Sequence, residues 1–531
     1  MVRKLKDRMM KFFKKLWDSN PLHVILIGAF LIRLLAAIFS QGYGMHDDHF
    51  LVLEASQSWV DGTDYNDWLP KSQVNPVPSG HSFFYVGIHF LILSTFKAVG
   101  IHNPKLLVFL IRLLHALFSL IVVAFGYKLA DRMGGRKAAI QVGLALSFLW
   151  FMPLLSVRNL VEVACIPFIM TGVWMTYVAI EESRSLKHYL FAGLVIGLAF
   201  SIRFQTVIFI GGVGLVILFR RKFWEAIIFG LGALISIILI QGVVDMFIWG
   251  RPFAELMEYI RYNIVHKADY GTNNPYMYAS IIIGVLLPPL GWLWIVGFFR
   301  SWKKTLIIVV PTLLFTAFHS YFPNKQERFI FPVLPFFVTA GIIGWYKIRE
   351  SKFWVNHPGF IKWLSIVFWV LNIALLLPIS VSSSKLSRVN AMYYLYGKSV
   401  PHGILVEDTL HENVNLLPGF YAGSWFVQYN LAKVSGKDTS SALVHKLIED
   451  GHYRKMIRSV HYFDSISVVQ LPEYVFICES KDLELRKKAI EQVFPPLKLE
   501  AVIEPSILDK ILYKQSKSNR NQTIYIYKVS K

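Results

Sequence analysis

Two adjacent carboxylates, Asp47 and Asp48, follow directly after the first long apolar run of the sequence. Charged groups at the edge of a bilayer are costly unless water or a partner solvates them. An ionised carboxylate can act as a general base on a hydroxyl, and a second acid with flanking His46 and His49 can tune or orient it. If this stretch is helical, Asp47 and Glu54 share one face. We therefore treat Asp47 as a candidate catalytic base.

Two other readings fit the same residues. Three more aspartates follow in the chain, at positions 61, 64 and 67, so the pair could simply belong to a solvated acidic loop. The spacing alone favours that loop over catalysis. His46, Asp47 and His49 could also ligate a metal ion, because imidazole and carboxylate are common ligand types.

The composition bounds the class of protein. The chain has 531 residues, of which 54% are hydrophobic and 17% are charged, against roughly 25% charged in soluble domains. This indicates an integral membrane protein. The net charge of +21 would suit nucleic-acid binding, but the basic residues form short clusters between apolar runs, as positive-inside topology requires. Cys165 and Cys478 offer neither a disulfide framework nor metal-ligand spacing.

Apolar runs predict about eleven membrane-spanning helices. A basic amphipathic segment precedes the first of them, and no small-residue cleavage site follows. We therefore expect the first helix to be retained and not removed as a signal peptide. The predicted spans are Leu22–Phe39, Leu107–Leu129, Ala138–Leu155, Val161–Ile180, Tyr189–Ser201, Val207–Phe219, Ala226–Trp249, Tyr278–Phe299, Leu306–Tyr321, Ile330–Tyr346 and Phe360–Ile379.

One further apolar run, Phe83–Val99, decides the topology. If it lies along the outer surface as an interfacial helix, the basic loops join the N-terminus on the cytoplasmic side. The same choice places other polar groups at the outer ends of helices. These are Asp47 and Asp48, Arg158 to Glu162, Arg203, Asp245 with the loop after it, and Lys325 to Arg328. Polar groups converging on one side of the membrane suggest a site.

Several of these groups also have an ordinary explanation. Arg158 could snorkel to the interface, and Glu162 could favour a helix N-terminus. Lys325 and Arg328 suit an anionic lipid phosphate, but they could instead form a local salt bridge with Glu327 or contact lipid headgroups.

The loop Trp249–Gly271 is aromatic and basic. It could line a sugar pocket through stacking and hydrogen bonds, or its aromatic residues could anchor a helix at the interface.

After Ile379 the chain becomes charged and mixed in pattern. Alternation predicts strands at Tyr474–Ser480 and Thr523–Val529, and helical runs occur at Ser441–Ile448 and Lys481–Val493. We expect a basic cytoplasmic segment at 1–21, a transmembrane catalytic domain at 22–380 with its first outer loop at 40–106, and an extracytoplasmic α/β domain at 381–531.

Taken together, these stretches resemble glycosyltransferase family 22, the Alg9-like and GPI-anchor mannosyltransferases of the GT-C superfamily. The His-Pro-Asp-Glu-x-Phe pattern of that family falls on Met45–Phe50, where Asp47 and Phe50 match, His-Pro is replaced and Glu becomes Asp48. Its His-Lys-Glu-x-Arg-Phe-x-x-Pro pattern resembles Asn324–Pro332, displaced by one position near its start.

Two further segments carry the resemblance. Tyr262–Gly271 is similar to the Tyr-Asn-Val…Tyr-Gly segment of the family, with Asp245 as its upstream acid, and Leu416–Trp425 is similar to the start of the family's soluble part. The motifs keep their order from Asp47 to about Trp425. A GT-C fold with about eleven transmembrane helices and a C-terminal α/β domain is the implied architecture.

The resemblance implies an inverting transferase that moves a sugar, mannose first, from a polyprenyl-phosphate donor to a glycolipid, glycan or protein acceptor. The residue matching the catalytic base is Asp47, with Asp48 beside it. Lys325 and Arg328, helped by Arg158 or Arg203, would stabilise the leaving phosphate. Substrate contacts are expected from Glu54, Glu162, Asp245, Tyr262, Asn263, His266, Tyr270 and Glu327. No nucleotide or metal cofactor is implied, and assistance by a divalent cation is left open.

The basic, compact chain looks bacterial, which would make the lipid undecaprenyl phosphate and place the site on the periplasmic side of the inner membrane. Rival enzymes are other GT-C transferases, of the protein O-mannosyltransferase or lipid A aminoarabinose transferase kind. A lipid or sugar transporter ranks lower, because no inverted repeat or broken mid-membrane helix is visible.

Overall fold

The computed structural model describes the chain except residues 1–14, 74–75, 268–271, 413, 434–453 and 517–518. It divides into two compact units. The first unit comprises the chain up to Phe39 together with Pro78–Tyr85 and Ile111–Val381, and the second comprises Ser40–Val77, Val86–Leu110 and Ser382–Lys531. The predicted helical membrane protein with a C-terminal α/β part is confirmed.

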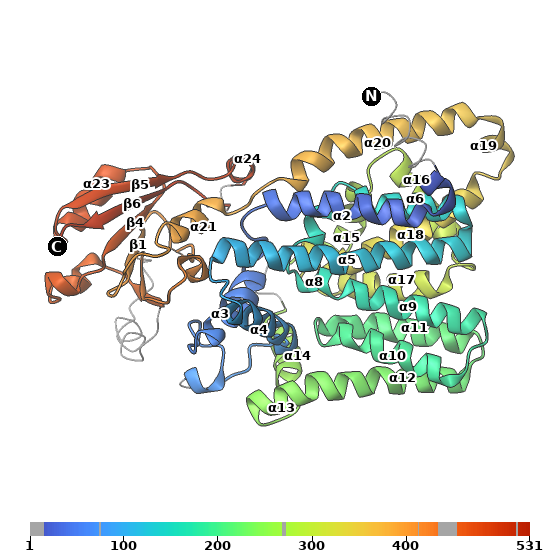
Figure 1. Cartoon of the computed structure of the whole chain (residues 1–531), viewed down its shortest axis with the longest axis horizontal. Helices are drawn as coiled ribbons and strands as arrows, with labels where there is room; N and C mark the ends of the chain where they lie inside the picture. Colours follow the sequence, from blue (N-terminus) through green and yellow to red (C-terminus); the bar gives the residue numbers. More distant parts are fainter. Residues whose placement is uncertain (1–14, 74–75, 268–271, 413, 434–453, 517–518) are drawn as a thin grey trace. The chain divides into compact units, whose positions relative to one another are not determined.

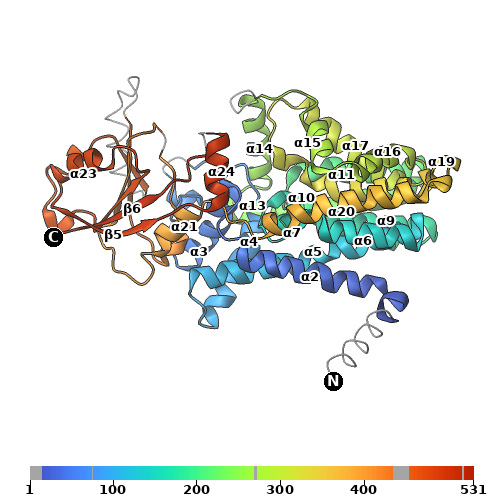
Figure 2. The same ribbon diagram turned by 90° about the horizontal axis from the view of Figure 1, so that it is seen from above.

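The first unit is helical, and Figures 1 and 2 show its helices α2, α5 and α20 lying lengthwise with roughly aligned axes. Its helices are α2 (Pro21–Phe39), most of α5 (Pro104–Gly134), α6 (Arg136–Phe148), α7 (Met152–Ser156), α8 (Val161–Ala164), α9 (Ile166–Glu181), α10 (Leu186–Phe200), α11 (Val207–Phe219), α12 (Phe223–Ile237), α13 (Val243–Trp249), α14 (Ala254–Val265), α15 (Met277–Val285), α16 (Leu290–Arg300), α17 (Leu306–Tyr321), α18 (Leu334–Ile348), α19 (Lys352–Asn356) and α20 (Pro358–Ser380). Short 3₁₀ and π segments are η3 (Phe204–Thr206), η4 (Ile238–Gly242) and η5 (Glu327–Val333).

Among the described residues, six helical stretches are long and apolar enough to cross a membrane, and five more apolar helices are shorter. The protein is thus an integral, multi-pass membrane protein. Two predicted spans are wrong as single helices. Tyr278–Phe299 is broken because α15 ends at Val285 and α16 starts at Leu290, and Ala138–Leu155 is broken because α6 ends at Phe148 and α7 starts at Met152. Pro288 and Pro289 lie in the break after α15 and lack the amide hydrogens that a continuous helix needs. The run at Phe83–Val99 forms helix α4 (Phe83–Ala98), and its interfacial position stays a prediction.

Small residues allow two helix pairs in this unit to approach closely. On α10, a Cβ at Gly193 would lie 2.1 Å from the carbonyl oxygen of Phe229 in α12. On α16, a Cβ at Gly297 would lie 2.2 Å from the carbonyl oxygen of Gly341 in α18. In lipid, where apolar burial gives little driving force between helices, such backbone contact is a main source of helix association.

A fully buried arginine also ties α2 to its neighbours. Arg33 donates from Nε to Ser119 Oγ (2.9 Å), from Nη2 to the carbonyl oxygen of Leu146 (3.1 Å) and from Nη1 to that of Ser147 (3.3 Å). The two carbonyls belong to the last turn of α6, whose C-terminal carbonyl groups lack partners within the helix. The cation in the middle of α2 therefore satisfies carbonyl groups at the C-terminal end of α6.

The C-terminal part of the second unit is a six-stranded sheet in the order β3-β2-β1-β4-β6-β5, in which β1 to β4 are parallel and β6 runs antiparallel to both β4 and β5. Figure 1 shows β5, β6, β4 and β1 side by side. The strands are β1 (Ile404–Asp408), β2 (Gln428–Ala432), β3 (Arg454–Ile457), β4 (Tyr474–Cys478), β5 (Leu497–Ile503) and β6 (Ile524–Val529). Its helices are α21 (Leu386–Tyr393), α23 (Leu483–Glu491) and α24 (Ile507–Gln515), with 3₁₀ turns η6 (Gly419–Ala422), η7 (Val460–Phe463) and η8 (Val468–Gln470).

The sequence prediction for this part is confirmed where it can be compared. Both predicted strands form, as β4 and β6, and the helical run at Lys481–Val493 forms α23. The run Ser441–Ile448 lies outside the described residues. One face of the sheet is closed by an apolar core that includes Leu405, Val475 and Tyr527.

The segment that carries Asp47 belongs to the same unit as this sheet. It contains η1 (Asp48–Glu54), a π-helix, followed by α3 (Ala55–Val60) and the 3₁₀ turn η2 (Pro70–Ser72). Its start is held against residues that follow the last membrane helix. Gly42 pairs with Ser384 in a parallel bridge, Ser384 Oγ donates to the carbonyl oxygen of Tyr43 (2.7 Å), and Lys385 Nζ donates to that of Gly44.

The bridge needs glycine at position 42. Gly42 has a φ of +82°, and a Cβ there would lie 1.6 Å from the carbonyl oxygen of Ser384. Both the left-handed backbone and the close approach exclude an L side chain. Gly62 in the same unit has a φ of +80° but nothing within 4 Å of the Cβ position. Substitutions at Gly42 and Gly62 therefore distinguish backbone strain, which both positions have, from steric conflict, which only Gly42 has.

We expect Gly42→Ala to displace the segment that carries Asp47 and to lower the thermal unfolding midpoint clearly more than Gly62→Ala does. Gly62→Ala meets only the left-handed strain, about 1–2 kcal/mol. Thermal unfolding in detergent, with limited proteolysis of the Gln41–Gly44 region, measures both effects. Equal effects of the two substitutions would contradict the role assigned to the bridge.

Candidate functional site

Asp47 stands at the start of the π-helix η1 and is the more open of the two acids. Its side chain is 42% exposed, whereas Asp48 is buried. The expectation that Asp47 and Glu54 share a helical face does not hold, because η1 is a π-helix and not an α-helix and Glu54 is fully buried. Single π turns inside helices are frequently found at functional sites. Of Asp47, Asp48 and Glu54, only Asp47 has a partly exposed side chain.

Glu54 anchors the whole segment. Its carboxylate forms an ion pair with Arg454 of β3, accepts a hydrogen bond from Asn66 Nδ2 (3.1 Å) and accepts another from the backbone N–H of Phe420 in η6 (3.1 Å). Burial raises the pKa of Glu54, and the guanidinium of Arg454 opposes that rise. Glu54, predicted to touch substrate, is instead enclosed by protein groups, which makes it a positioning residue.

The two histidines of the segment pack against aromatic rings. His49 is fully buried and stacks on Tyr43 (ring centroids 4.6 Å apart) and on Tyr421 (5.5 Å). His46 packs on Phe50 at 4.2 Å, and burial lowers its pKa. Among the residues that the structure describes, no group of three or more His, Cys, Asp or Glu side chains is placed to hold a metal ion.

In the first unit, the structure brings together three of the predicted residues. Arg203 Nη1 lies 2.7 Å from Glu162 Oε1, and Arg328 Nε lies 3.4 Å from the same oxygen. All three side chains are buried, and Nε and Nη2 of Arg203 are buried without a hydrogen-bond partner among the described residues. One carboxylate thus faces two guanidinium groups, and the cluster has unfilled donors on Arg203 and an unfilled acceptor, Oε2 of Glu162, among the described residues.

The other predicted cations lie near this cluster in the sequence. Arg158 is buried at the turn before α8, so surface snorkelling does not describe it. Lys325 is buried and donates to the carbonyl oxygen of Phe322 (2.6 Å), and Arg328 also donates to Gln326 Oε1 (2.8 Å). Glu327 is exposed. Arg328 therefore pairs with the distant Glu162, not with its neighbour Glu327.

The predicted aromatic loop Trp249–Gly271 is largely a helix, α14. Asn263 donates to the carbonyl oxygen of Tyr259 (2.8 Å), and the rings of Tyr262 and His266 lie 4.4 Å apart. Tyr270 lies outside the described residues. Asp245 is fully buried and accepts from Gln241 Nε2 (2.9 Å) and from the backbone N–H of Glu255 (3.1 Å). Here the buried acid caps the start of α14.

An apolar pocket of about 350 Å³ opens beside α14. Its lining includes Phe200, Phe204, Tyr259, Asn263, Phe318 and Phe329. The guanidinium of Arg203 lies 4.8 Å from the ring centroid of Phe329, which also lines the pocket. An apolar chamber with a buried cation against one of its lining rings suits an amphipathic, anionic ligand.

Sequence reasoning missed Glu255, which lies inside the predicted loop without any local signal. It is fully buried and accepts from the backbone N–H groups of Gly80 (2.6 Å) and His81 (3.2 Å), and from Trp249 Nε1 (2.9 Å). It thereby fastens the turn before α4 to the start of α14. Burial raises the pKa of Glu255 to about 7.

We expect Glu54→Ala to lower the free energy of unfolding by about 3–5 kcal/mol, because it leaves Arg454 buried and unpaired. The double substitution Glu54→Leu with Arg454→Met should recover much of that loss, since no unpaired charge remains. Glu504→Ala is the control, because Glu504 and Lys510 form an exposed pair. Calorimetry or thermal unfolding in detergent measures the series. A double variant no more stable than Glu54→Ala would contradict the ion-pair account.

The raised pKa of Glu255 predicts how the stability of the fold depends on pH. Between its ordinary value of 4.5 and about 7 the folded state binds the proton more tightly than the unfolded state. Stability should therefore fall as pH rises through this window, by at most about 1.4 kcal/mol per pH unit. Glu255→Gln should remove this slope and leave the remaining pH dependence intact. Thermal unfolding midpoints of both proteins from pH 4.5 to 8 test this, and parallel curves would refute it.

Comparison with known proteins shows which proteins the chain is similar to. The chain is 24% identical over 363 residues to human GPI alpha-1,2-mannosyltransferase 3, which covers 65% of this chain and 61% of that protein. It is 22% identical over 386 residues to GPI mannosyltransferase 3 of Debaryomyces hansenii, covering 69% and 66%. The matches thus span less than two thirds of either relative.

Among solved structures, the fold is similar to that of ArnT from Cupriavidus metallidurans bound to undecaprenyl phosphate. The TM-score is 0.62 at 13% identity, and the match covers 97% of this chain and 98% of that one. The GT-C fold expected from the sequence is thereby confirmed. The sequence profile of the Alg9-like mannosyltransferases matches residues 24–398, most of the chain. The protein belongs to the Alg9-like mannosyltransferase family.

Proposed function

We propose that the protein is an inverting mannosyltransferase. It takes mannose from a polyprenyl-phosphate donor and transfers it to a hydroxyl of a glycolipid, glycan or protein acceptor. The site faces the extracytoplasmic side, in a bacterial inner membrane with the N-terminus in the cytoplasm. Family membership supports the sugar and the reaction type. The named activity of the relatives supports the same assignment.

The observation that carries the donor class is the apolar pocket of the first unit together with Arg203, whose guanidinium lies against the pocket-lining ring of Phe329. A polyprenyl chain needs an apolar chamber, and its phosphate needs fixed cations. Arg203 has two buried donor groups without partners among the described residues, and Arg328 lies against the same Glu162 carboxylate. That the similar fold of ArnT was solved with undecaprenyl phosphate is consistent with this donor class.

The reaction needs a base and charge stabilisation. Asp47 takes the proton of the acceptor hydroxyl as the oxygen attacks the anomeric carbon, and the bond from that carbon to the phosphate oxygen breaks. Arg203 and Arg328, with Lys325 and Arg158, stabilise the negative charge that develops on the leaving phosphate. Asp48 is buried beside Asp47 and orients the Asp47 carboxylate. No step of this scheme calls for a nucleotide or a metal ion.

The test is transfer of labelled mannose from polyprenyl-phosphate-mannose to acceptors in the host membranes. Asp47→Asn should lower the rate by about 10²–10⁴-fold, as expected for removal of a general base, while donor binding stays unchanged. Asp464→Asn is the matched control, because Asp464 is an exposed acid of the same unit. Donor binding is measured separately, with polyprenyl phosphate.

Full activity of Asp47→Asn would overturn Asp47 as the base. Loss of activity only in Asp48→Asn would move that role to Asp48. Wild-type membranes that transfer glucose or galactose from the corresponding donor, and not mannose, would overturn the assigned sugar. Failure to bind polyprenyl phosphate, with Arg203→Gln no different from wild type, would overturn the donor class.

A further inference from the structure

Helix α24 of the second unit has an exposed amphipathic face that the proposed reaction does not use. Ile507, Lys510, Ile511 and Lys514 are spaced three and four residues apart, so they share one face of the helix. All four side chains are exposed, Ile507 to 79% and Ile511 to 48%. Asp509, on the opposite face, is buried. Large apolar side chains beside lysines on one helical face are typical of a helix that lies on a membrane surface.

The N-terminus of α24 is fastened to the chain that follows the last membrane helix. Ser506 Oγ donates to the carbonyl oxygen of Ser383 (2.6 Å). Asp509 Oδ1 accepts from the backbone N–H of Lys385 (2.9 Å), and Asp509 Oδ2 accepts from that of Leu386 (3.3 Å). Ser506 and Asp509 also form a capping box, in which each side chain accepts from the backbone N–H of the other residue. The helix therefore starts at a fixed place in its unit.

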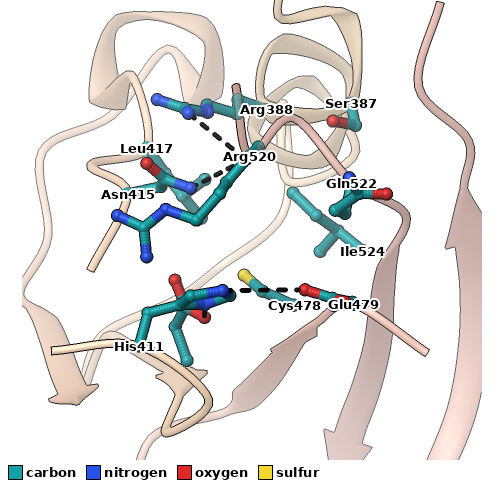
Figure 3. Close-up of a pocket in the computed structure, with 11 residues that line it drawn as sticks. Ser387, Arg388, His411, Asn415, Leu417, Cys478, Glu479, Arg520, Gln522 and Ile524 are labelled. Carbon is teal, nitrogen blue, oxygen red and sulfur yellow. Dashed lines mark hydrogen bonds and ion pairs between the residues drawn. The ribbon is translucent and has the colours of Figure 1, made fainter. Parts of the chain in front are cut away.

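The chain beyond the other end of α24 is fixed as well. The carbonyl oxygen of Arg520, which follows α24, accepts hydrogen bonds from Arg388 of α21 (3.4 Å) and from Asn415 (2.7 Å), as Figure 3 shows. Helix α21 begins at Leu386, which also binds Asp509. Both sides of α24 are thus tied to α21 and to the residues before it, so the exposed face keeps its direction.

The attachment point of α24 is joined by short stretches of chain to two candidate membrane spans, α2 and α20. Helix α20 ends at Ser380, three residues before Ser383. Helix α2 ends at Phe39, two residues before Gln41. The N–H of Gln41 donates to Ser383 Oγ (3.1 Å), and its carbonyl oxygen accepts from the N–H of Ser384 (3.1 Å). Because three residues of extended chain reach about 11 Å at most, the start of α24 is confined to the edge of the membrane.

Charge and apolar area together favour a lipid surface as the partner of this face. Isoleucine side chains suit the acyl boundary below the headgroups, and lysine stems lie along that boundary while their ammonium groups meet lipid phosphates. The ion pair of Lys510 with Glu504 (3.1 Å) competes only weakly, because both side chains are more than half exposed. The attachment beside the ends of two membrane helices favours lipid over a soluble partner.

Docking of α24 on lipid also bears on the candidate base. The residues that hold α24 bind the segment that leads to Asp47, because Ser384 Oγ donates to the carbonyl oxygen of Tyr43 (2.7 Å) and Lys385 Nζ donates to that of Gly44. Asp47 follows three residues later. A lipid-linked donor carries its phosphate at the membrane surface, so the height of Asp47 above that surface decides whether base and donor meet.

We propose that α24 is an interfacial helix that docks on an anionic phospholipid surface. Ile507 and Ile511 enter the acyl boundary, and Lys510 and Lys514 bind lipid phosphates. This docking goes beyond the proposed function and does not depend on it. Its consequence for catalysis rests on the proposed function, since the docked helix holds Asp47 at the level of the lipid-linked donor.

Spin-label accessibility tests the docking directly. The full chain with Ile511→Cys carries a nitroxide in nanodiscs of phosphatidylcholine and phosphatidylglycerol, with both native cysteines replaced by alanine. The label should be more accessible to oxygen, which concentrates in lipid, than to a water-soluble nickel chelate. Leu485→Cys is the matched control, because Leu485 is a 71% exposed residue of α23 in the same unit. Its label should favour the nickel chelate.

The lysines give a second arm of the same experiment. Lys510→Gln with Lys514→Gln should shift the docking equilibrium about tenfold or more toward the undocked helix, because each lysine near an anionic surface contributes about fivefold. Nanodiscs without phosphatidylglycerol should have a similar effect on the unsubstituted lysines. Equal docking in all of these samples would overturn the role of the lysines and of the anionic lipid.

Transfer from polyprenyl-phosphate-mannose tests the consequence for catalysis. Ile507→Ser with Ile511→Ser should lower the rate in membranes by about tenfold or more, because small displacements of a catalytic group are costly. Binding of polyprenyl phosphate and the thermal unfolding midpoint should stay as in wild type, since both side chains are exposed. Leu485→Ser is the control and should leave transfer unchanged.

The outcomes separate this proposal from the proposed function. A label at position 511 that is as accessible to the nickel chelate as the label at position 485 would overturn the docking. A label shielded from both oxygen and the chelate would also overturn it, because such shielding indicates contact with protein. Docking in a wild type without transferase activity would support the interfacial helix and overturn the function. Docking with full transfer by the double serine variant would overturn the link to Asp47.

Discussion

The buried carboxylate of Glu54 is the interaction on which the second unit depends. It joins three segments that are far apart in the chain, because Arg454 of β3, the backbone of η6 and Asn66 all bind to it. A buried ion pair has a desolvation cost that only complete hydrogen bonding offsets. Here the carboxylate has several partners, and the guanidinium also lies on the rings of Phe50 and Tyr65. These contacts hold the short segment that carries Asp47 in a fixed position.

A buried ion-pair cluster also lies in the helical unit. Glu162 is buried and pairs with two arginines, Arg203 and Arg328. Buried charged groups are costly unless they are paired and hydrogen-bonded. The unfilled donors of Arg203 and the apolar pocket that shares Phe329 with it suit the proposed donor, a phosphate with a hydrocarbon chain.

Local pattern predicted much of the architecture correctly. Most of the apolar runs became helices without a break, and the alternating stretches Tyr474–Ser480 and Thr523–Val529 became β4 and β6. The break between α15 and α16 was present in the sequence as Pro288 and Pro289, and the apolar run around it concealed the signal. Glu255 and Arg33 could not be identified, because their partners come from other parts of the chain and no spacing marks them.

By itself, the sequence determined that the chain is a multi-pass membrane protein of this family, because hydropathy, charge asymmetry and short motifs are local properties of consecutive residues. Only the tertiary structure decided that the segment of Asp47 belongs to the same unit as the C-terminal sheet, and that Glu54 is an anchor. It also decided that Asp408, His411 and Glu479 meet at the carboxyl ends of β1 and β4. Such groupings depend on strand order and on the burial of polar atoms, which arise when distant segments pack together and leave no periodic trace in the chain.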